Sequence, residues 1–332
     1  MSAEGPLFVS YRDTLDLLSA AEALEVVERV YGMHARGSVQ WSDPPSFHMD
    51  DEGLHNHWHV KACLLKDIPI AGVRMYGYFE DSERSTVGTL DSTRLVVISD
   101  PETSVPLAIV DEHWNFSIRS TAAACIACKW MTNPDPKVLG LVGVGSMGRT
   151  ALQCLSSMYA FEEIRCTSRR PETREAFAEE WSAALGVPVI PVATPEETVV
   201  GADIAVGGTT STEIVSRVEW LKPGSTFISL ARRELDPAGW PKMDKVVIDD
   251  FGLNMLSRVF RETVDKGYLS RETLHAEIWE LVAGRKPGRE HPDERALIHT
   301  VGLVSQDVAL AEFVYRKAVE KGVGIRLPAA HS

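Results

Sequence analysis

The sequence predicts an α/β protein of two domains, one built on a doubly wound parallel sheet and the other on a mainly antiparallel sheet. Three observations lead to this prediction. The chain of 332 residues is longer than one ordinary domain and fits two. Between about residues 55 and 110, strand-like segments follow one another without helices. From residue 138 onward, short apolar segments alternate with helical patterns.

The N-terminal part begins with a helix and continues with strands. In residues 20–36, AAEALEVVERVYGMHAR, apolar side chains recur three and four positions apart, which predicts an amphipathic helix ending before Gly37. The segments HWHVKACLL, IPIAGVRMYGYF and TRLVVIS are rich in β-branched and aromatic residues and are separated by turn signals. We therefore expect them to form an antiparallel sheet. The next apolar stretch, SIRSTAAACIACKWM, predicts one further helix.

In the C-terminal part of the sequence, strand-like and helix-like patterns alternate. KVLGLVGVG predicts a short strand, and a helix is expected over residues 146–158. Because helical patterns separate most of the later strands, the sheet should be parallel and doubly wound. The last apolar pattern, SQDVALAEFVYRKAVEKG, predicts another amphipathic helix. The later strands are expected near residues 163–167, 187–191, 203–207, 226–230 and 245–248.

Charge and composition restrict the classes of partner. The net charge of −13 argues against nucleic-acid binding, which needs clustered Lys and Arg. No apolar run approaches the roughly 20 residues that cross a bilayer, and the first twenty residues have no pattern of a signal peptide. The five cysteines are scattered and odd in number, which suits a reducing compartment. We expect a cytoplasmic protein with no nucleic-acid or membrane partner.

A glycine pattern follows the strand at residue 138. VGVGSMG contains Gly143, Gly145 and Gly148 in the spacing GxGxxG, with Ser146 and Met147 between the last two. In a strand–turn–helix context this spacing is typical of a dinucleotide site. The first glycine makes the turn, the second lets the backbone approach a pyrophosphate, and the third allows close packing of the helix. These five residues are therefore predicted to bind a nicotinamide dinucleotide in a Rossmann domain.

The end of the second strand of this domain bears on the choice of cofactor. NAD sites usually place an acid there for the ribose hydroxyl, whereas this chain has Ser168, Arg169 and Arg170. Guanidinium and hydroxyl groups suit a 2′-phosphate, so NADP(H) is favoured and NAD(H) is the alternative. The other interpretation is that these arginines merely solvate the start of a helix.

Several stretches together resemble one known family over nearly the whole chain. VVISDPETSVPLAIVD, SIRSTAAA, VGVGSMG, GGTTSTEIV, EWLKPGSTFISL and HTVGLVSQDVALAEFVY are similar to motifs of the ornithine cyclodeaminase/μ-crystallin family. The resemblance implies a Rossmann domain at residues 123–304, inserted in an α+β domain of residues 1–122 plus 305–332 that binds substrate and forms homodimers. The stretch LHAEIWELVAGRKPGREHPDE resembles a branch that oxidatively releases diaminopropionate.

The resemblance also assigns roles to individual residues. Arg119 matches the arginine that grips the substrate carboxylate, a pairing that is strong and directional. Ser120 matches a residue that contacts a cofactor phosphate. Further residues match segments along the cofactor and beside the nicotinamide, namely Thr209, Thr210, Ser211, Thr300 and Val301.

Two positions depart from the family pattern. The catalytic lysine of the family falls on Arg74, and a guanidinium cannot readily transfer protons, although it can hold a carboxylate. The catalytic aspartate falls near Glu234, which keeps the acid–base function but moves it by one methylene. The alternative interpretation is that both residues serve only in structural salt bridges.

HNHWHVK places His55, His57 and His59 on alternate positions of one strand. On a straight strand the outer two lie about 13 Å apart, so one zinc ion with bonds of about 2 Å cannot take all three. Two of them with a distant third ligand could still form a site, but no motif supplies that ligand and no metal site is predicted. The same strand face should present His59 and Lys61 to the active site or to a dimer interface. Either one is then a candidate replacement for the missing proton donor.

The residues taken together predict an NAD(P)(H)-dependent oxidoreductase that acts on an amino acid or the corresponding imino or keto acid. Arg119 and Arg74 would hold the carboxylate, and Glu234, His59 or Lys61 would move the proton. Two alternatives stay open. One is an ornithine cyclodeaminase-type ammonia lyase with bound NAD, and the other is a non-catalytic, μ-crystallin-like protein that binds NADPH and small molecules.

Overall fold

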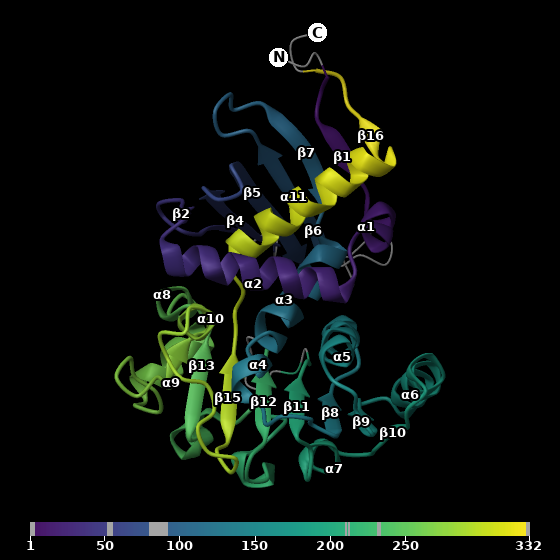
Figure 1. The fold of residues 1–332 in the computed structure, drawn as a ribbon, viewed down its shortest axis with the longest axis vertical. Coiled ribbons are helices and arrows are strands. Elements are labelled where there is room, and N and C mark those ends of the chain that lie inside the picture. The colour runs from purple at the N-terminus through teal and green to yellow at the C-terminus, as the bar shows by residue number, and fades with distance from the viewer. Residues whose placement is uncertain are drawn as a thin grey trace. The chain divides into compact units, whose positions relative to one another are not determined.

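In the computed structural model, two sheets organise the chain (Figure 1). The structure describes residues 4–51, 56–79, 92–209, 211, 213–230 and 234–329. One unit comprises Met1–Arg119 and Val304–Ser332, and the other comprises Ser120–Leu303. The chain therefore leaves the first unit, builds the second, and returns to finish the first.

The sheet of the first unit is mainly antiparallel, with strand order β16-β1-β7-β6-β5-β4-β2 and β3 paired to β4. Among the described strands of this sheet, only β1 and β7 pair in parallel. The long central strands correspond to the predicted ones, so this part of the prediction is confirmed. The strands are β1 (Leu7–Val9), β2 (Val39–Trp41), β3 (Phe47–Asp51), β4 (Asn56–Leu65), β5 (Ile70–Phe79), β6 (Ser92–Ser99), β7 (Pro106–Asp111) and β16 (Ile325–Arg326).

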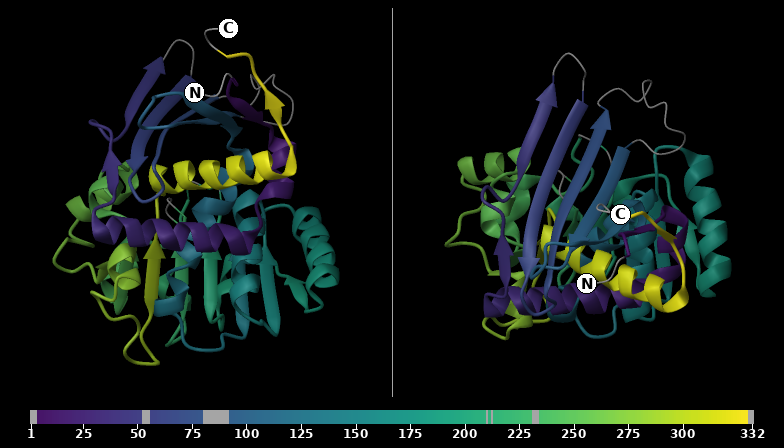
Figure 2. Two further views of the ribbon diagram at one scale, coloured as in Figure 1. Left: turned by 45° about the horizontal axis from the view of Figure 1, so that its top comes forward. Right: turned by 90° about the horizontal axis from the view of Figure 1, so that it is seen from above.

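Helices α2 (Ala20–Arg36) and α11 (Val304–Lys321) run side by side in the first unit (Figure 2). The bounds of α2 match the prediction because Ser19 caps its start and Gly37 ends it at φ 70°. Helix α11 lies across β4, β5 and β6. A Cβ at Gly72 would come within 2.5 Å of Val308, so this glycine lets α11 pack directly on β5. The unit also contains α1 (Tyr11–Leu17) and the first half of α3 (His113–Cys125).

The sheet of the second unit is parallel throughout, with strand order β10-β9-β8-β11-β12-β15-β13-β14. The predicted fold class, a parallel sheet together with a separate antiparallel sheet, is thus confirmed. The sequence did not predict β15, which lies between β12 and β13 in the middle of the sheet. The strands are β8 (Val138–Val142), β9 (Glu163–Thr167), β10 (Val189–Pro191), β11 (Ile204–Gly207), β12 (Thr226–Ser229), β13 (Lys245–Ile248), β14 (Ala276–Glu277) and β15 (Ala296–His299).

The helices of the second unit follow most of the predicted pattern. The prediction of a single helix over SIRSTAAACIACKWM is wrong, because α3 ends at Cys125 and a separate helical turn, α4 (Cys128–Met131), follows it. No described helix combines the length and the apolar character that a bilayer crossing demands. The remaining helices are α5 (Ser146–Met158), α6 (Pro171–Leu185), α7 (Pro195–Val199), η2 (Val218–Trp220), η3 (Pro237–Lys242), α8 (Phe251–Asn254), α9 (Arg258–Asp265) and α10 (Ile278–Val282).

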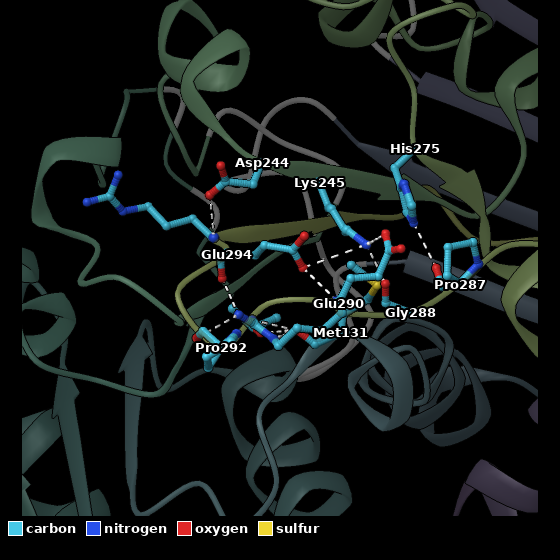
Figure 3. A network of polar contacts seen from close by, with 12 residues as sticks. Met131, Asp244, Lys245, His275, Pro287, Gly288, Glu290, Pro292 and Glu294 are labelled. Carbon is cyan, nitrogen blue, oxygen red and sulfur yellow. Dashed lines mark hydrogen bonds and ion pairs between the residues drawn. The ribbon is translucent and has the colours of Figure 1, made fainter.

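A polar network fastens the segment before β15 to the rest of the second unit (Figure 3). The guanidinium of Arg289 donates to the carbonyl oxygen of Met131 at 2.7 Å and to Thr226 Oγ1 at 3.2 Å. Nearby, the buried ammonium of Lys245 donates to Glu290 Oε2 at 2.7 Å. Since a charged donor satisfies several backbone acceptors at once, Arg289 should contribute measurably to stability.

Replacing Arg289 with alanine is expected to lower the free energy of unfolding by about 2 kcal/mol, because the carbonyl oxygen of Met131 loses its charged donor. Chemical denaturation followed by circular dichroism measures the change. Lys286→Ala, an exposed position of the same segment, is the control and should change stability by less than about 0.5 kcal/mol. Equal stabilities of the two variants would contradict the anchoring role of Arg289.

Candidate functional site

The glycine turn follows β8 in the second unit. Gly143 has φ +100°, and a Cβ there would lie 2.6 Å from the carbonyl oxygen of Gly208. A Cβ at Gly148 would lie 2.1 Å from the carbonyl oxygen of Gly143, so the packing of α5 requires this glycine. At Gly145, in contrast, an added Cβ would meet nothing within 4 Å among the described residues. Packing therefore accounts for the first and third glycines, whereas the second borders open space.

Open space at Gly145 is what a dinucleotide pyrophosphate needs. Gly145 is the N-cap of α5 and is exposed, as is Ser146, and no side chain among the described residues caps the helix. The first amide groups of α5, including those of Ser146 and Met147, have no partners within the helix and favour an anion. The turn also lies where the strand order reverses, between β8 and β11. Ligands of doubly wound sheets bind at this switch point, so the residues present fit a dinucleotide.

The end of β9 carries no acid. Ser168 Oγ donates to the carbonyl oxygen of Arg170 at 2.8 Å, and Arg169 and Arg170 are exposed. The first carboxylate along the chain is that of Glu172, in the first turn of α6. The immediate surroundings of the strand end therefore offer cations and a hydroxyl.

Of the other residues predicted to line the cofactor, Thr209, Thr300 and Val301 follow the carboxyl ends of strands in the same parallel sheet. Thr209 follows β11, and its Oγ1 accepts from the amide of Ser211 at 3.1 Å. Thr300 and Val301 follow β15. Thr210 lies outside the described residues. Ser120 is the first residue of the second unit and lies within α3, and its predicted phosphate contact stays a prediction.

Glu234 is held in a buried chain of hydrogen bonds. Ser229 Oγ donates to Glu234 Oε2 at 2.8 Å, and His299 Nδ1 lies 3.0 Å from the same hydroxyl oxygen. Since Ser229 gives its one hydrogen to the carboxylate, His299 must be the donor to Ser229. Burial lowers the pKa of His299 to about 4, so the imidazole is neutral near pH 7. A Cβ at Gly207 would lie 2.3 Å from Glu234 Cβ, so that glycine makes room for the carboxylate.

In the first unit, two buried arginines share two buried carboxylates. Arg74 on β5 is 2% exposed, and its Nε donates to Glu112 Oε1 at 2.5 Å. Arg119 on α3 donates through Nε to Asp307 Oδ1 at 2.5 Å. The second oxygen of Asp307 lies 3.6 Å from Arg74 Nε. The two arginines predicted from the sequence to act together are thus brought together, and the carboxylates that bind them were not predicted.

Two aromatic rings lie beneath these guanidinium groups. The guanidinium carbon of Arg74 lies 4.3 Å from the ring centre of Tyr76, and that of Arg119 lies 4.8 Å from the ring centre of Phe116. A third arginine, Arg94 on β6, lies 3.9 Å from the centre of Phe116. We call this group of three arginines, two carboxylates and two rings the arginine cluster. Its charges and flat rings suit a small anion, a carboxylate above all.

His59 and Lys61 share the sheet face of the arginine cluster. Lys61 pairs with Arg74 in the register of β4 and β5, and His59 pairs with Tyr76. The ring of His59 stacks on Tyr76 with centres 4.6 Å apart, and its Nε2 lies 3.2 Å from His48 Nδ1. His59 and Arg74 therefore both contact the ring of Tyr76. This arrangement agrees with a shared strand face, and a proton-transfer role for either residue stays a prediction.

The metal prediction concerns residues that the structure covers only in part. His55 lies outside the described residues, and the side chain of His57 is not described. Elsewhere in the described chain, no three His, Cys, Asp or Glu side chains gather as metal ligands would.

A model of the ornithine cyclodeaminase/mu-crystallin family matches residues 7–322. The chain belongs to this family. The resemblance inferred from the sequence motifs is therefore confirmed, and the similarity extends through both units of this family member.

Three similar proteins illustrate the range of the ornithine cyclodeaminase/mu-crystallin family. An N-((2S)-2-amino-2-carboxyethyl)-L-glutamate dehydrogenase of Staphylococcus aureus is 26% identical over 86% of this chain and 84% of the relative. The structure of the Thermococcus litoralis Delta(1)-pyrroline-2-carboxylate reductase with NADH and L-proline has a TM-score of 0.89 and 28% identity, covering 97% of this chain and 100% of that one. An archaeal alanine dehydrogenase dimer with bound NAD has a TM-score of 0.88 and 27% identity, covering 97% and 98%.

Sequence reasoning missed several residues of the site in this family member. Arg94 pairs with Tyr76 across β5 and β6, so register alone brings it to the face of Arg74. Glu112 follows β7 directly and belongs to no motif. A charged residue at the end of a buried strand could nevertheless have marked it as a candidate site residue. Asp307 lies within the predicted last helix, on the side that packs against the sheet.

Proposed function

We propose that this protein is an NAD(P)(H)-dependent oxidoreductase that acts on an amino acid or the corresponding imino or keto acid. The observation that carries the proposal is the buried arginine cluster. Arg74 Nη2 is buried and has no hydrogen-bond partner among the described residues, so it needs an acceptor. A substrate carboxylate supplies one. The open turn at Gly145 supports the cofactor, and the similar dehydrogenases and the reductase support the reaction class.

The residues divide the chemistry between them. When bound, the nicotinamide supplies or accepts the hydride. Arg119 and Arg74 hold the carboxylate of the substrate and orient its α-carbon. Burial alone would lower the pKa of Arg74, but Glu112 and Asp307 raise it above its ordinary value, so this guanidinium keeps its proton. The proton must therefore move through another group, for which Glu234, His59 and Lys61 are the proposed candidates.

We further propose that NADP(H) is preferred. Arg169 and Arg170 are exposed beside Ser168, and no carboxylate lies among these three residues to repel a 2′-phosphate. Two of the similar structures contain NADH or NAD, so the proposed preference would distinguish this chain from those two proteins.

The variant with both Arg169→Ala and Arg170→Ala is expected to bind NADPH at least tenfold more weakly, because it loses charged hydrogen bonds to the phosphate, and to bind NADH unchanged. Quenching of protein fluorescence gives both dissociation constants. The control is Arg261→Ala on α9, which should change neither of them. A wild-type protein that binds NADH as tightly as NADPH would contradict the preference.

We also propose a homodimer in which residues 1–122 and 305–332 bind substrate and form the interface. The archaeal alanine dehydrogenase dimer supports the stoichiometry. Light scattering coupled to gel filtration tests it, and a monomer at micromolar concentration would oppose it.

A panel of substrates tests the reaction. Alanine, proline, ornithine, lysine and N-(2-amino-2-carboxyethyl)glutamate are incubated with NADP⁺ or NAD⁺, and Δ¹-pyrroline-2-carboxylate and pyruvate plus ammonia are incubated with the reduced cofactors. We expect cofactor oxidation or reduction with at least one of them. Ammonia release from ornithine or lysine without net cofactor reduction would instead favour the cyclodeaminase. Tight cofactor binding without turnover would favour a non-catalytic binding protein.

A further inference from the structure

Glu112 and Asp307 form a buried pair of carboxyl groups within the arginine cluster. Glu112 is 0% exposed to solvent and Asp307 is 1% exposed. Glu112 Oε1 accepts from Arg74, but Glu112 Oε2 has no donor among the described residues. The same nitrogen, Arg74 Nε, lies 2.5 Å from Glu112 Oε1 and 3.6 Å from Asp307 Oδ2, so the two carboxyl groups are close neighbours. Because two buried carboxylates at such close quarters repel each other, their arrangement favours a proton on one of the two groups.

The surroundings decide which group carries that proton. Burial raises the pKa of Glu112 to about 8, and the negative charge of Asp307 adds to the rise while Arg74 opposes it. Burial would also raise the pKa of Asp307, but Arg119 and Arg74 outweigh it and hold that pKa below its ordinary value. Near pH 7, Glu112 is therefore the neutral acid and Asp307 the carboxylate.

The other charged and titratable groups around the pair make the site cationic in this state. With one proton on the pair, a single carboxylate faces the guanidinium groups of Arg74 and Arg119. Without that proton, the two carboxylates balance the charges of Arg74 and Arg119, and Arg94 supplies the remaining guanidinium charge of the cluster. The groups that face the pair are Arg74 and Tyr76 on β5, Arg94 on β6, Arg119 on α3, and Lys61 and Cys63 on β4.

We propose that Glu112 and Asp307 share one proton, and that this proton maintains the positive charge with which Arg74 and Arg119 receive the substrate carboxylate. Glu112 is then a positioning residue that acts through Arg74. The inference rests on the proposed function and extends it by coupling substrate binding to protonation. Above the pKa of Glu112, binding of one carboxylate takes up one proton from solvent, and the proton resides on Glu112 in the complex.

A measurement without ligand tests the protonation state. We expect the infrared spectrum of the full-length protein to show the carbonyl stretch of a buried carboxylic acid near neutral pH that disappears with a midpoint near pH 8. Glu112→Gln should lack this titrating band, and the matched control Glu102→Gln, an exposed residue of the same unit, should retain it. Absence of the band from the wild type, or its persistence in Glu112→Gln, overturns the proposal.

A binding measurement tests the coupling. Pyrrole-2-carboxylate, a planar analogue of a cyclic imino acid, is titrated calorimetrically into the NADPH-saturated protein in two buffers of different ionisation enthalpy. Above about pH 8 the Kd of the wild type should weaken about tenfold per pH unit with uptake of one proton, whereas Glu112→Gln should bind independently of pH. No binding at any pH, or the same pH dependence in Glu112→Gln, overturns the proposal.

The two proposals fail in different ways. Turnover with an amino acid together with pH-independent binding would contradict only the proposal that Glu112 and Asp307 share a proton. A titrating infrared band and proton-linked binding without turnover of any substrate would contradict only the proposal that the protein is an oxidoreductase.

Discussion

Arg119→Ala is expected to lower kcat/KM by about 10³-fold, because two charge-assisted hydrogen bonds of about 1.5–3 kcal/mol each to the substrate carboxylate are lost. The loss should include kcat, since Arg119 is proposed to orient the reacting carbon as well as to bind the substrate. Steady-state kinetics with the best substrate of the panel measures the effect. The affinity for NADPH should stay within about threefold of the wild type.

Two further variants separate binding from folding. Removal of Arg119 leaves Asp307 as a buried carboxylate with one fewer partner, which carries a stability cost of about 3 kcal/mol. Arg119→Lys keeps a positive charge beside Asp307 but lacks the bidentate fork, so it should fold and still lose about tenfold in kcat/KM. Arg36→Ala removes an exposed ion pair with Asp67 in the same unit and should leave kinetics unchanged. Wild-type kcat/KM in folded Arg119→Lys and Arg119→Ala would rule out the carboxylate-binding role.

Gly145→Ala is expected to weaken binding of the dinucleotide by roughly 10³-fold, because the new methyl group keeps the pyrophosphate away from the helix amides and removes two charged hydrogen bonds. The backbone of Gly145 has φ −72°, which alanine adopts readily, and its Cβ meets no described atom within 4 Å. The protein should therefore fold normally. Fluorescence titration with NADPH measures affinity, and thermal unfolding without cofactor measures stability.

The third glycine of the turn, Gly148, gives a different pattern and serves as the comparison. At Gly148 a Cβ would lie 2.1 Å from the carbonyl oxygen of Gly143, so Gly148→Ala should lower the Tm of the protein without cofactor as well as its affinity. A Gly145→Ala protein with wild-type affinity would show that the pyrophosphate does not approach this turn.

Local sequence patterns predicted the elements whose ends carry their own signals. The helix over residues 20–36 was predicted with its true bounds because its apolar residues recur at helical spacing and Gly37 ends it. The turn at Gly143, Gly145 and Gly148 was likewise predicted from a local pattern, the spacing of its glycines after a strand. In such places the physical cause lies within a few residues of its effect.

What the sequence did not predict depends on contacts between distant segments. The insertion of strand β15 between β12 and β13 is a property of the whole sheet. Arg94 joins the arginine cluster only through the register of β5 with β6. Glu112 and Asp307 are far apart in sequence and meet because α11 returns to pack on β5 at Gly72. No periodicity within one segment encodes these meetings.

The return of the chain to its first unit sets an order in time during synthesis. Arg74 and Arg119 leave the ribosome well before Asp307, and the 184 residues of Ser120–Leu303 are made in between. Domains tend to fold as their sequence emerges, so the nucleotide-binding half can mature while the earlier guanidinium groups still lack one of their counter-ions. A polypeptide that stops before Val304 would present those cations without Asp307. The arginine cluster therefore gains its second carboxylate only after the whole second unit has been made.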